Sequence, residues 1–266
     1  MLVLRGLCAR HAQAAGFALS DVNLTIAQGE QIALVGPSGA GKTTLLHTLA
    51  GAIQPDSGEF TAFGTSPWQL SHAGRHIWRS RFFLAPQTPP LPPRQRVVTT
   101  VLAGCLPQWS IWKAIASLVK PVAPDIAYDA LARFNLQDKL YARVDRLSGG
   151  ERQRCGLARL LVSQAKVLLV DEPLSALDPE LSLQTLGVLQ QEAASRCATL
   201  VCSLHQVELA RRHFPRLIGL RDGQVVFDAD RDNVTDAMIT ALYQNASSIT
   251  PDADSVATKP TVGARC

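Results

Sequence analysis

The segment from Gly36 to Thr43 constrains the fold more than any other part of the chain, because it reads G-P-S-G-A-G-K-T. It follows a short apolar run, Gln31 to Val35, and precedes a segment, Thr43 to Ala50, whose leucines have helical spacing. Strand, glycine-rich loop and helix in this order point backbone N–H groups and a helix N-terminus at one anion. The spacing G-x-x-x-x-G-K-[ST] therefore predicts a P-loop that binds nucleotide phosphates, rather than a chance turn before a helix.

Within this loop, we expect Lys42 to reach the β- and γ-phosphates and the Thr43 hydroxyl to bind Mg²⁺. The other residues would contact phosphate oxygens through their backbone N–H groups. The predicted nucleotide-binding residues are Gly36, Pro37, Ser38, Gly39, Ala40, Gly41, Lys42, Thr43 and Thr44.

A second apolar run, Val167 to Val170, ends in the two carboxylates Asp171 and Glu172. Asp171 is placed to hold Mg²⁺ directly or through water, whereas Glu172 could orient and deprotonate the attacking water. A solvated strand end with no function would look the same in isolation. The P-loop upstream favours the catalytic interpretation, and together the two motifs predict a nucleotide hydrolase.

Strands that alternate with helices along the chain predict an α/β fold with a parallel sheet. Leu217–Leu220 and Gln224–Phe227 flank Asp222-Gly223, which is typical of a hairpin. Five of the eight residues from Pro86 to Pro93 are proline, and a stiff, extended segment of this kind suits a boundary between subdomains. The next stretch, from Val97 to about Asp145, is mostly helical by pattern, with breaks at prolines.

Composition argues against several classes of protein. The 26 Lys and Arg against 22 Asp and Glu give a net charge of +4 without any basic block, which is weak support for nucleic-acid binding. The apolar stretches fall short of the roughly 18 residues that a membrane span needs, and we expect no signal peptide. The six scattered cysteines indicate reduced thiols rather than a disulfide frame or zinc site. His72 and His76 suggest an exposed helix face.

Leu147 to Gln153 reads L-S-G-G-E-R-Q and opens another predicted helix. Here Ser148, Gly149 and Gly150 would form a second anion site that contains no lysine. Alone, such a segment is a common turn. Its position between the P-loop and the strand that ends in Asp171 gives it weight.

Six motifs, in this order over about residues 1 to 230, resemble those of the nucleotide-binding subunits of ATP-binding-cassette (ABC) transporters. They are Gly36–Thr43 (similar to Walker A), Gln87 (the Q-loop glutamine), Leu147–Gln153 (the signature), Val167–Glu172 (Walker B), Ser175–Asp178 (the D-loop) and His205 (the switch histidine).

The resemblance implies an α/β P-loop NTPase core with a mostly parallel sheet, an N-terminal antiparallel β part and an inserted helical subdomain. It would form one ABC ATPase domain over residues 1–245, with the core in 1–87 and 161–245 and the helical subdomain in 88–160. Residues 246–266 would be a disordered tail.

The resemblance also implies an ATP hydrolase in which two copies pack head to tail. Each ATP would lie between Walker A of one chain and the signature of the other, so Ser148, Gly149 and Gly150 would serve the partner's nucleotide and Asp178 would act across the dimer. The implied catalytic residues are Glu172, His205, Gln87 and Lys42. The implied magnesium ligands are Thr43, Gln87 and Asp171.

Several details depart from the family's pattern or stay open. In the family an aromatic residue after the first strand stacks on adenine. Counting forward from Leu7 puts this position at His11, whereas counting back from Val22 gives no clean match and Phe17 is the nearest ring. The proline-rich run after Gln87 is unusual, and Glu151 stands where glutamine is commoner.

Val101–Leu106, with Trp109 and Trp112 after it, resembles the phosphonate-importer branch, as do His205–Ala210 and Leu220–Asp228. The leading hypothesis is therefore an ATPase that powers uptake of phosphonate or a related phosphorus oxyanion. Its partners would be an integral membrane permease and, indirectly, a periplasmic binding protein, with no nucleic acid. It would lie on the cytoplasmic face of the inner membrane.

Two alternatives remain open: an ABC ATPase for another substrate, or one attached to a soluble phosphonate-breakdown complex. The two tryptophans could equally serve only to pack the helical subdomain.

Overall fold

The main sheet has six strands, and it carries most of the predicted site. The computed structural model describes residues 1–10, 16–119 and 121–244. The strand order is β5-β6-β7-β3-β8-β9, in which all neighbours are parallel except β8 and β9. The strands are β3 (Gln31–Val35), β5 (Phe82–Ala85), β6 (Val167–Asp171), β7 (Thr199–Ser203), β8 (Arg216–Arg221) and β9 (Gln224–Asp230).

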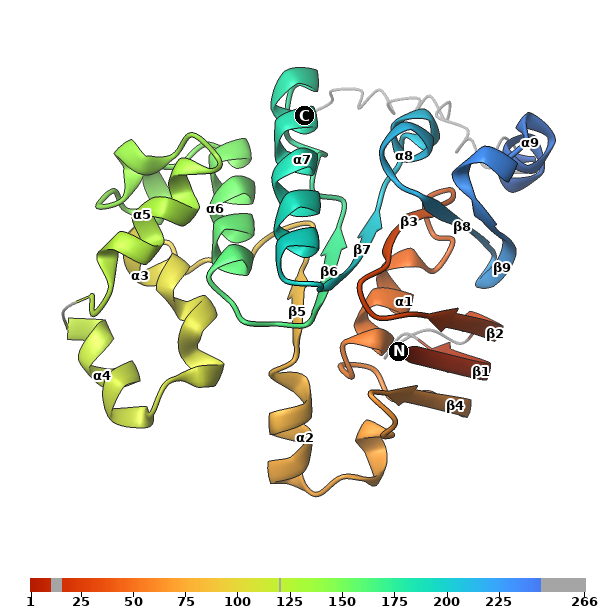
Figure 1. Cartoon of the computed structure of the whole chain (residues 1–266), viewed down its shortest axis with the longest axis horizontal. Helices are drawn as coiled ribbons and strands as arrows, with labels where there is room; N and C mark the ends of the chain where they lie inside the picture. The colour runs from red at the N-terminus through yellow and green to blue at the C-terminus, as the bar shows by residue number, and fades with distance from the viewer. Residues whose placement is uncertain (11–15, 120, 245–266) are drawn as a thin grey trace, which may run out of the picture.

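A smaller antiparallel sheet, in the order β2-β1-β4, covers one side of this core (Figure 1). It consists of β1 (Leu2–Arg10), β2 (Phe17–Ile26) and β4 (Ser57–Ala62). The expected α/β class, with its antiparallel N-terminal part, is confirmed.

Helices cover the main sheet and form a separate group at its β5 edge (Figure 1). Those around the core are α1 (Lys42–Leu49), α2 (His72–Arg79), α7 (Pro179–Ser195), α8 (Val207–His213) and α9 (Asp236–Tyr243). The group at the edge contains α3 (Val97–Leu102), α4 (Ile111–Val119), α5 (Pro124–Ala132) and α6 (Gly149–Leu161). Short 3₁₀ turns are η1 (Pro67–Gln69), η2 (Ala103–Gln108), η3 (Gln137–Lys139), η4 (Val144–Arg146) and η5 (Arg231–Asn233).

Alternate side chains of the parallel strands enter two different apolar cores. In β6, Val167 and Leu169 join the core shared with α1 and the antiparallel sheet, whereas Leu168 and Val170 face the opposite core. Because both faces are buried, these strands are continuous apolar runs. This burial on both faces explains why the strands could be recognised in the sequence as apolar runs.

The core on that second face continues into the helical group. Val101 from α3 and Leu131 from α5 belong to the same buried cluster as Val170 and Leu200 of the sheet. The helical group therefore rests on the sheet through shared apolar packing. The division of the chain into a core and a helical subdomain stays a prediction.

The prolines of the helical group occupy two kinds of position, and only one of them marks the boundary of an element. Pro124 is the first residue of α5, where its missing N–H costs nothing. Pro107 instead lies inside the 3₁₀ turn η2 and so does not end it.

Local predictions elsewhere can be checked directly. Asp222 and Gly223 both have positive φ, 50° and 77°, as the predicted tight hairpin between β8 and β9 requires. His72 and His76 are exposed on α2, as expected of a solvated helix face. No helix in residues 1–10, 16–119 and 121–244 is long and apolar enough to cross a bilayer.

Candidate functional site

The P-loop joins the end of β3 to the start of α1, and two of its glycines are required by close backbone contacts. A Cβ at Gly36 would lie 2.0 Å from the carbonyl oxygen of Leu220, and one at Gly41 would lie 2.5 Å from that of Ala18. Gly41 also has a φ of 101°, in the region that favours glycine. The loop is therefore held between β2 and β8 while α1 begins directly after it.

Lys42 is buried at the first position of α1. Its Nζ donates hydrogen bonds to the carbonyl oxygens of Gly36, at 2.7 Å, and Pro37, at 3.0 Å. Burial lowers the pKa of Lys42, whereas the carboxylates of Glu172 and Asp171 act to raise it. The ammonium group thus lies inside the curve of the loop, close to both acidic residues.

Asp171, the last residue of β6, is buried and accepts two hydrogen bonds from hydroxyl groups. Thr43 Oγ1 donates to Asp171 Oδ2 at 2.8 Å, and Ser203 Oγ donates to Asp171 Oδ1 at 2.6 Å. The first bond joins the two residues that the sequence predicted as magnesium ligands, although they are 128 positions apart.

Glu172 follows immediately but faces a different set of groups. Its Oε2 accepts a hydrogen bond from Gln87 Nε2 at 2.8 Å, and its Oε1 lies 2.6 Å from His205 Nε2. The residue has a φ of 46°, in the left-handed region, so the chain turns sharply after Asp171. The structure thus brings together three of the four predicted catalytic side chains, Gln87, Glu172 and His205.

Two residues that sequence reasoning left out of the site hold this turn in place. Ser203 Oγ also accepts the backbone N–H of Glu172, at 2.9 Å. Gln153, buried on α6, donates through Nε2 to the carbonyl oxygen of Glu172 at 2.8 Å and accepts the N–H of Ala176 at 3.3 Å. The only available signal was position: Ser203 ends the strand beside β6, and Gln153 ends the signature.

A cavity of about 380 Å³ lies over the P-loop. Its lining combines the loop with Ala18, Gln87, Glu172 and His205. Among the described residues, Ser148, Gly149, Gly150 and Asp178 do not contribute to this lining. Within one chain, the signature residues and the P-loop therefore form separate surfaces.

The signature opens α6 through a reciprocal capping interaction. Ser148 Oγ accepts the N–H of Glu151 at 3.2 Å, and the N–H of Ser148 donates to Glu151 Oε2 at 2.8 Å. This backbone hydrogen bond is the main reason that the pKa of Glu151 is lowered, with Lys139 contributing further. A glutamate suits this third helical position, which gives a structural reason for its presence there.

Asp178 caps α7, where its Oδ1 accepts the N–H of Leu181 at 3.0 Å. Its role across a dimer stays a prediction. Of the two candidates for adenine stacking, His11 lies outside the described residues. The ring of Phe17 is half exposed, stacks beneath the Arg10 guanidinium at 4.4 Å, and does not line the P-loop cavity.

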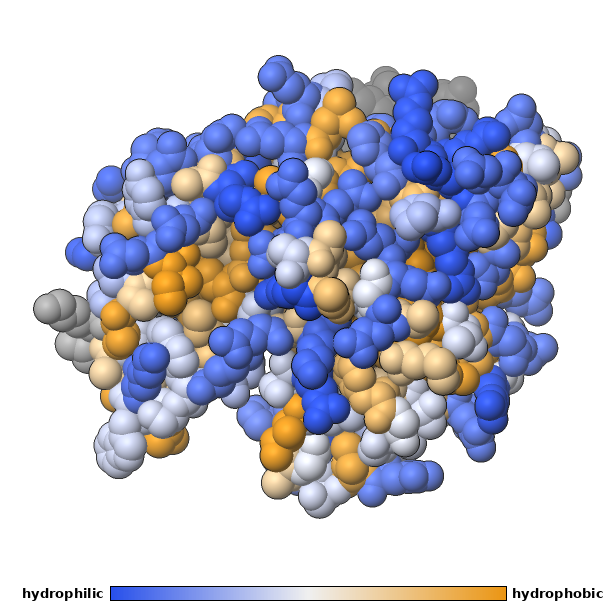
Figure 2. Space-filling model, viewed as in Figure 1, coloured by the Kyte–Doolittle hydropathy of each residue, from blue (hydrophilic) through white to orange (hydrophobic). Residues whose placement is uncertain are grey.

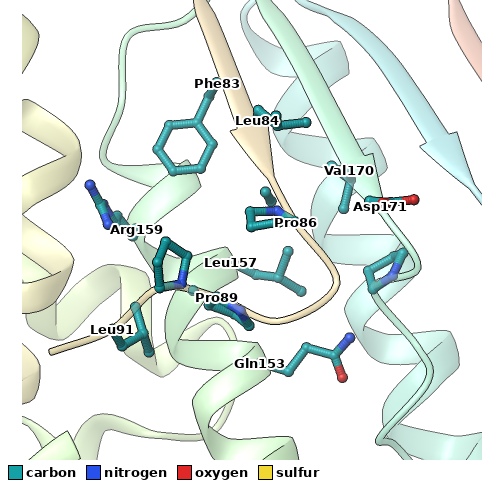
Figure 3. Close-up of a pocket in the computed structure, with 14 residues that line it drawn as sticks. Phe83, Leu84, Pro86, Pro89, Leu91, Gln153, Leu157, Arg159, Val170 and Asp171 are labelled. Atoms are coloured by element: carbon teal, nitrogen blue, oxygen red, sulfur yellow. The ribbon is translucent and has the colours of Figure 1, made fainter. Parts of the chain in front are cut away.

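The proline-rich run after Gln87 lies across α6 and lines a second cavity of about 160 Å³ (Figure 3). Pro89 and Leu91 of the run line this cavity together with Gly156 and Leu157 of that helix. A Cβ at Gly156 would lie 2.6 Å from Pro89, so glycine permits this close approach. The run is therefore packed against the same helix that carries the signature.

These motifs agree with a family comparison, in which the family described as ABC transporter matches residues 19–175. The chain belongs to the ABC transporter ATPase family. It is accordingly an ATP-hydrolysing transport ATPase.

Curated relatives of this ABC ATPase cover most of the chain. It is 56% identical over 243 residues to a protein named phosphonates import ATP-binding protein PhnC 2, from Albidiferax ferrireducens, covering 90% of this chain and 88% of the relative. A Polaromonas protein named PhnC is 56% identical, with 88% and 86% covered. A PhnC 2 from Pseudomonas aeruginosa is 53% identical, with 86% and 85% covered.

Solved structures support the ABC ATPase fold. The ATP-binding cassette MJ0796, in a dimeric post-hydrolysis state with ADP and Pi, gives a TM-score of 0.77 at 24% identity, covering 87% of this chain and 99% of that one. The cbiO1 protein of Clostridium perfringens, part of the ABC transporter complex cbiONQ, gives 0.72 at 22% identity, covering 91% and 94%. At such identities the likeness concerns the fold alone.

Proposed function

We propose that this ABC ATPase powers the import of phosphonate or a related phosphorus oxyanion. The observation that carries the substrate assignment is the 56% identity, over 90% of the chain, to a protein named for phosphonate import. The similarity of Val101–Leu106 and the two following tryptophans to the phosphonate branch supports the same substrate.

In this proposal, ATP binds over the P-loop, and Lys42 contacts its β- and γ-phosphates. The residues fit Mg²⁺, because the Thr43 hydroxyl and the Asp171 carboxylate already lie 2.8 Å apart and are hard oxygen donors. Gln87 would complete the protein's ligands. When bound, the ion would neutralise negative charge on the phosphates.

Glu172 acts as the general base in this proposal. Its carboxylate would orient the attacking water and accept a proton from it. Its backbone N–H donates to Ser203 and its carbonyl oxygen accepts from Gln153, and these two hydrogen bonds support its position. His205, adjacent to Glu172 Oε1, would contact the γ-phosphate. Gln87 would couple changes at the nucleotide site to the proline-rich run that follows it in the chain.

The active form is proposed to be a head-to-tail homodimer. The P-loop cavity of one chain is not lined by that chain's own signature, which supports completion by the Ser148, Gly149 and Gly150 of a second copy. Asp178 would act across the same interface. An integral membrane permease, a periplasmic binding protein upstream of it, and a peripheral position on the cytoplasmic face of the inner membrane complete the proposal.

Growth on a phosphonate as sole phosphorus source tests this function. In a host without a redundant importer, deletion of the gene should abolish that growth, and the wild-type gene should restore it. A Glu172→Gln gene should fail to restore it, because the ATPase step is lost. Growth on inorganic phosphate is the control and should be unaffected.

Two results would contradict the proposal. Unimpaired growth of the deletion strain on phosphonate would refute the substrate. Copurification of the ATPase with soluble enzymes, and without a permease, would instead favour attachment to phosphonate-breakdown machinery.

A further inference from the structure

The chain contains no aspartate or glutamate between Glu59 and Asp125, although its 22 acidic residues are otherwise spread along the sequence. This interval does contain basic residues, namely Arg75, Arg79, Arg81, Arg94, Arg96, Lys113 and Lys120. So long an interval without a carboxylate gives one part of the molecule a positive charge that the overall value of +4 conceals.

The interval contains two helices, α2 and α4, that project on one side of the molecule. In Figure 1 both extend past the lower end of β5, with α4 at the left and α2 near the centre. The 3₁₀ turn η2 leads into α4. We call the surface made by α2, η2 and α4 (residues 72–79 and 103–119) the acid-free edge.

Large apolar side chains are exposed along the acid-free edge. The exposed fractions are 79% for Trp112, 69% for Ile111, 62% for Ile77, 50% for Ile115 and 44% for Leu106. In α4, Ile111 and Ile115 are four residues apart and so share a face, with Trp112 beside them. Figure 2 shows apolar side chains at the ends of both projections.

A cation accompanies the apolar residues of α4. The Lys113 ammonium lies 4.9 Å from the centre of the Trp109 ring, and the lysine is exposed next to Trp112. An exposed helix face of this composition, with tryptophan, isoleucine and lysine but without carboxylates, is typical of segments that lie in the headgroup region of a bilayer.

We propose that the acid-free edge contacts an anionic lipid surface directly. Ile111, Trp112 and Ile115 would enter the headgroup region, and the basic side chains of the same edge, Lys113 of α4 with Arg75 and Arg79 of α2, would neutralise lipid phosphates. Charge complementarity favours this occupant, because an anionic bilayer offers negative charge to an edge whose own residues include Arg75, Arg79 and Lys113 but no carboxylate. The inference extends the proposed function by naming a second membrane contact, and it does not depend on the transported substrate.

Binding of the purified full chain to protein-free vesicles tests this inference. The chain should cosediment with vesicles of phosphatidylcholine and phosphatidylglycerol but not with vesicles of phosphatidylcholine alone. Binding should weaken as salt is added, since salt screens exposed charges.

Matched variants locate the contact. Trp112→Ser with Ile115→Ser should weaken vesicle binding by about tenfold or more, whereas Leu183→Ser, at an exposed leucine of α7, should not. Lys113→Glu should weaken it roughly fivefold or more. Arg212→Glu on α8 makes the same change of charge elsewhere and should have little effect. All four variants should retain ATPase activity, which shows that they fold.

Several outcomes would overturn the inference. These are no binding to the anionic vesicles, unchanged binding after the double substitution in α4, or equal weakening by Lys113→Glu and Arg212→Glu. Binding only to vesicles that contain a permease would assign the acid-free edge to a protein partner instead. Failure of the wild-type gene to support growth on phosphonate would refute the proposed substrate without affecting vesicle binding.

Discussion

Asp171 and Glu172 are adjacent in sequence but have different surroundings. Both carboxylate oxygens of Asp171 accept hydrogen bonds from hydroxyl groups, one from Thr43 of α1 and one from Ser203 of β7. Glu172 contacts Gln87 and His205, which lie in segments that follow β5 and β7. Glu172 has a positive φ, so the chain leaves the direction of β6 at this residue, directly after Asp171.

Replacing Glu172 by glutamine tests its proposed role as general base. The variant keeps the shape of the side chain, so ATP should bind normally. Hydrolysis should fall roughly 10²- to 10⁴-fold, because the amide cannot accept the proton. Turnover and ATP binding of the purified chain measure the two effects.

Glu208→Gln, at an exposed glutamate of α8, is the matched control and should turn over normally. Wild-type turnover in Glu172→Gln would exclude Glu172 as the base. Loss of ATP binding in that variant would point to a structural role.

Ser203→Ala tests the positioning of both carboxylates. Without this hydroxyl, buried Asp171 loses a donor and the N–H of Glu172 loses an acceptor, which should lower the free energy of unfolding by about 1–3 kcal/mol. ATPase activity should also fall. Urea unfolding and turnover measure these changes, and Ser195→Ala at the end of α7 should alter neither. Equal stability of the two variants would show that the Ser203 contacts are dispensable.

At the scale of single residues, the motifs predicted which side chains would meet but not what holds them. The association of Gln87, Glu172 and His205 was expected from the resemblance. Ser203 and Gln153 could not be assigned a role, because their contacts depend on the register of β6 against β7 and on the docking of α6.

Among the elements, α6 begins with a capping box whose strength depends on pH. The pKa of Glu151 is lowered in the folded chain, so its ionised form stabilises α6. That contribution is fully present above the unfolded pKa of about 4.3 and is lost as the pH falls through the lower folded value.

Glu151→Gln should therefore reduce the free energy of unfolding at pH 7 by roughly 0.5–1 kcal/mol. The difference from wild type should shrink as the pH falls through the lowered folded pKa of Glu151, because the wild-type carboxylate then also becomes neutral. Urea unfolding of the wild type and the variant, from pH 7 down to acid pH, measures this difference in the free energy of unfolding. A difference independent of pH would contradict the role of the charge.

Some elements could be predicted from sequence and others could not, for a physical reason. Strands β3, β6 and β7 are buried on both faces and therefore appear as apolar runs. Strand β4 begins with exposed Ser57, Gly58 and Glu59, and β5 has four residues, so neither gives a clear pattern. Their pairing with β1 and β6 determines their conformation.

For the whole molecule, the main prediction concerns which chains complete each ATP site. Lys42→Ala and Ser148→Arg should each be inactive alone. In the proposed dimer, a mixed pair has one site with both defects and one site with neither. Mixing the two purified variants should then restore activity, up to about a quarter of the wild-type rate for random pairing.

If each chain formed its ATP site alone, mixing would restore nothing, because every site would still carry one defect. Ser148→Arg should leave ATP binding by a single chain intact, since Ser148 does not line the P-loop cavity. Mixing Lys42→Ala with Glu172→Gln is the control, because those two defects lie in the same half of a site and no intact site can form.

The contact between Pro89 and Gly156 joins the segment after Gln87 to the helix that carries the signature. Any side chain at position 156 would meet the stiff proline ring at 2.6 Å. The two positions should therefore vary together among related sequences, with a larger residue at 156 found only where 89 is small. Such paired changes would indicate that selection maintains the close packing of these two segments.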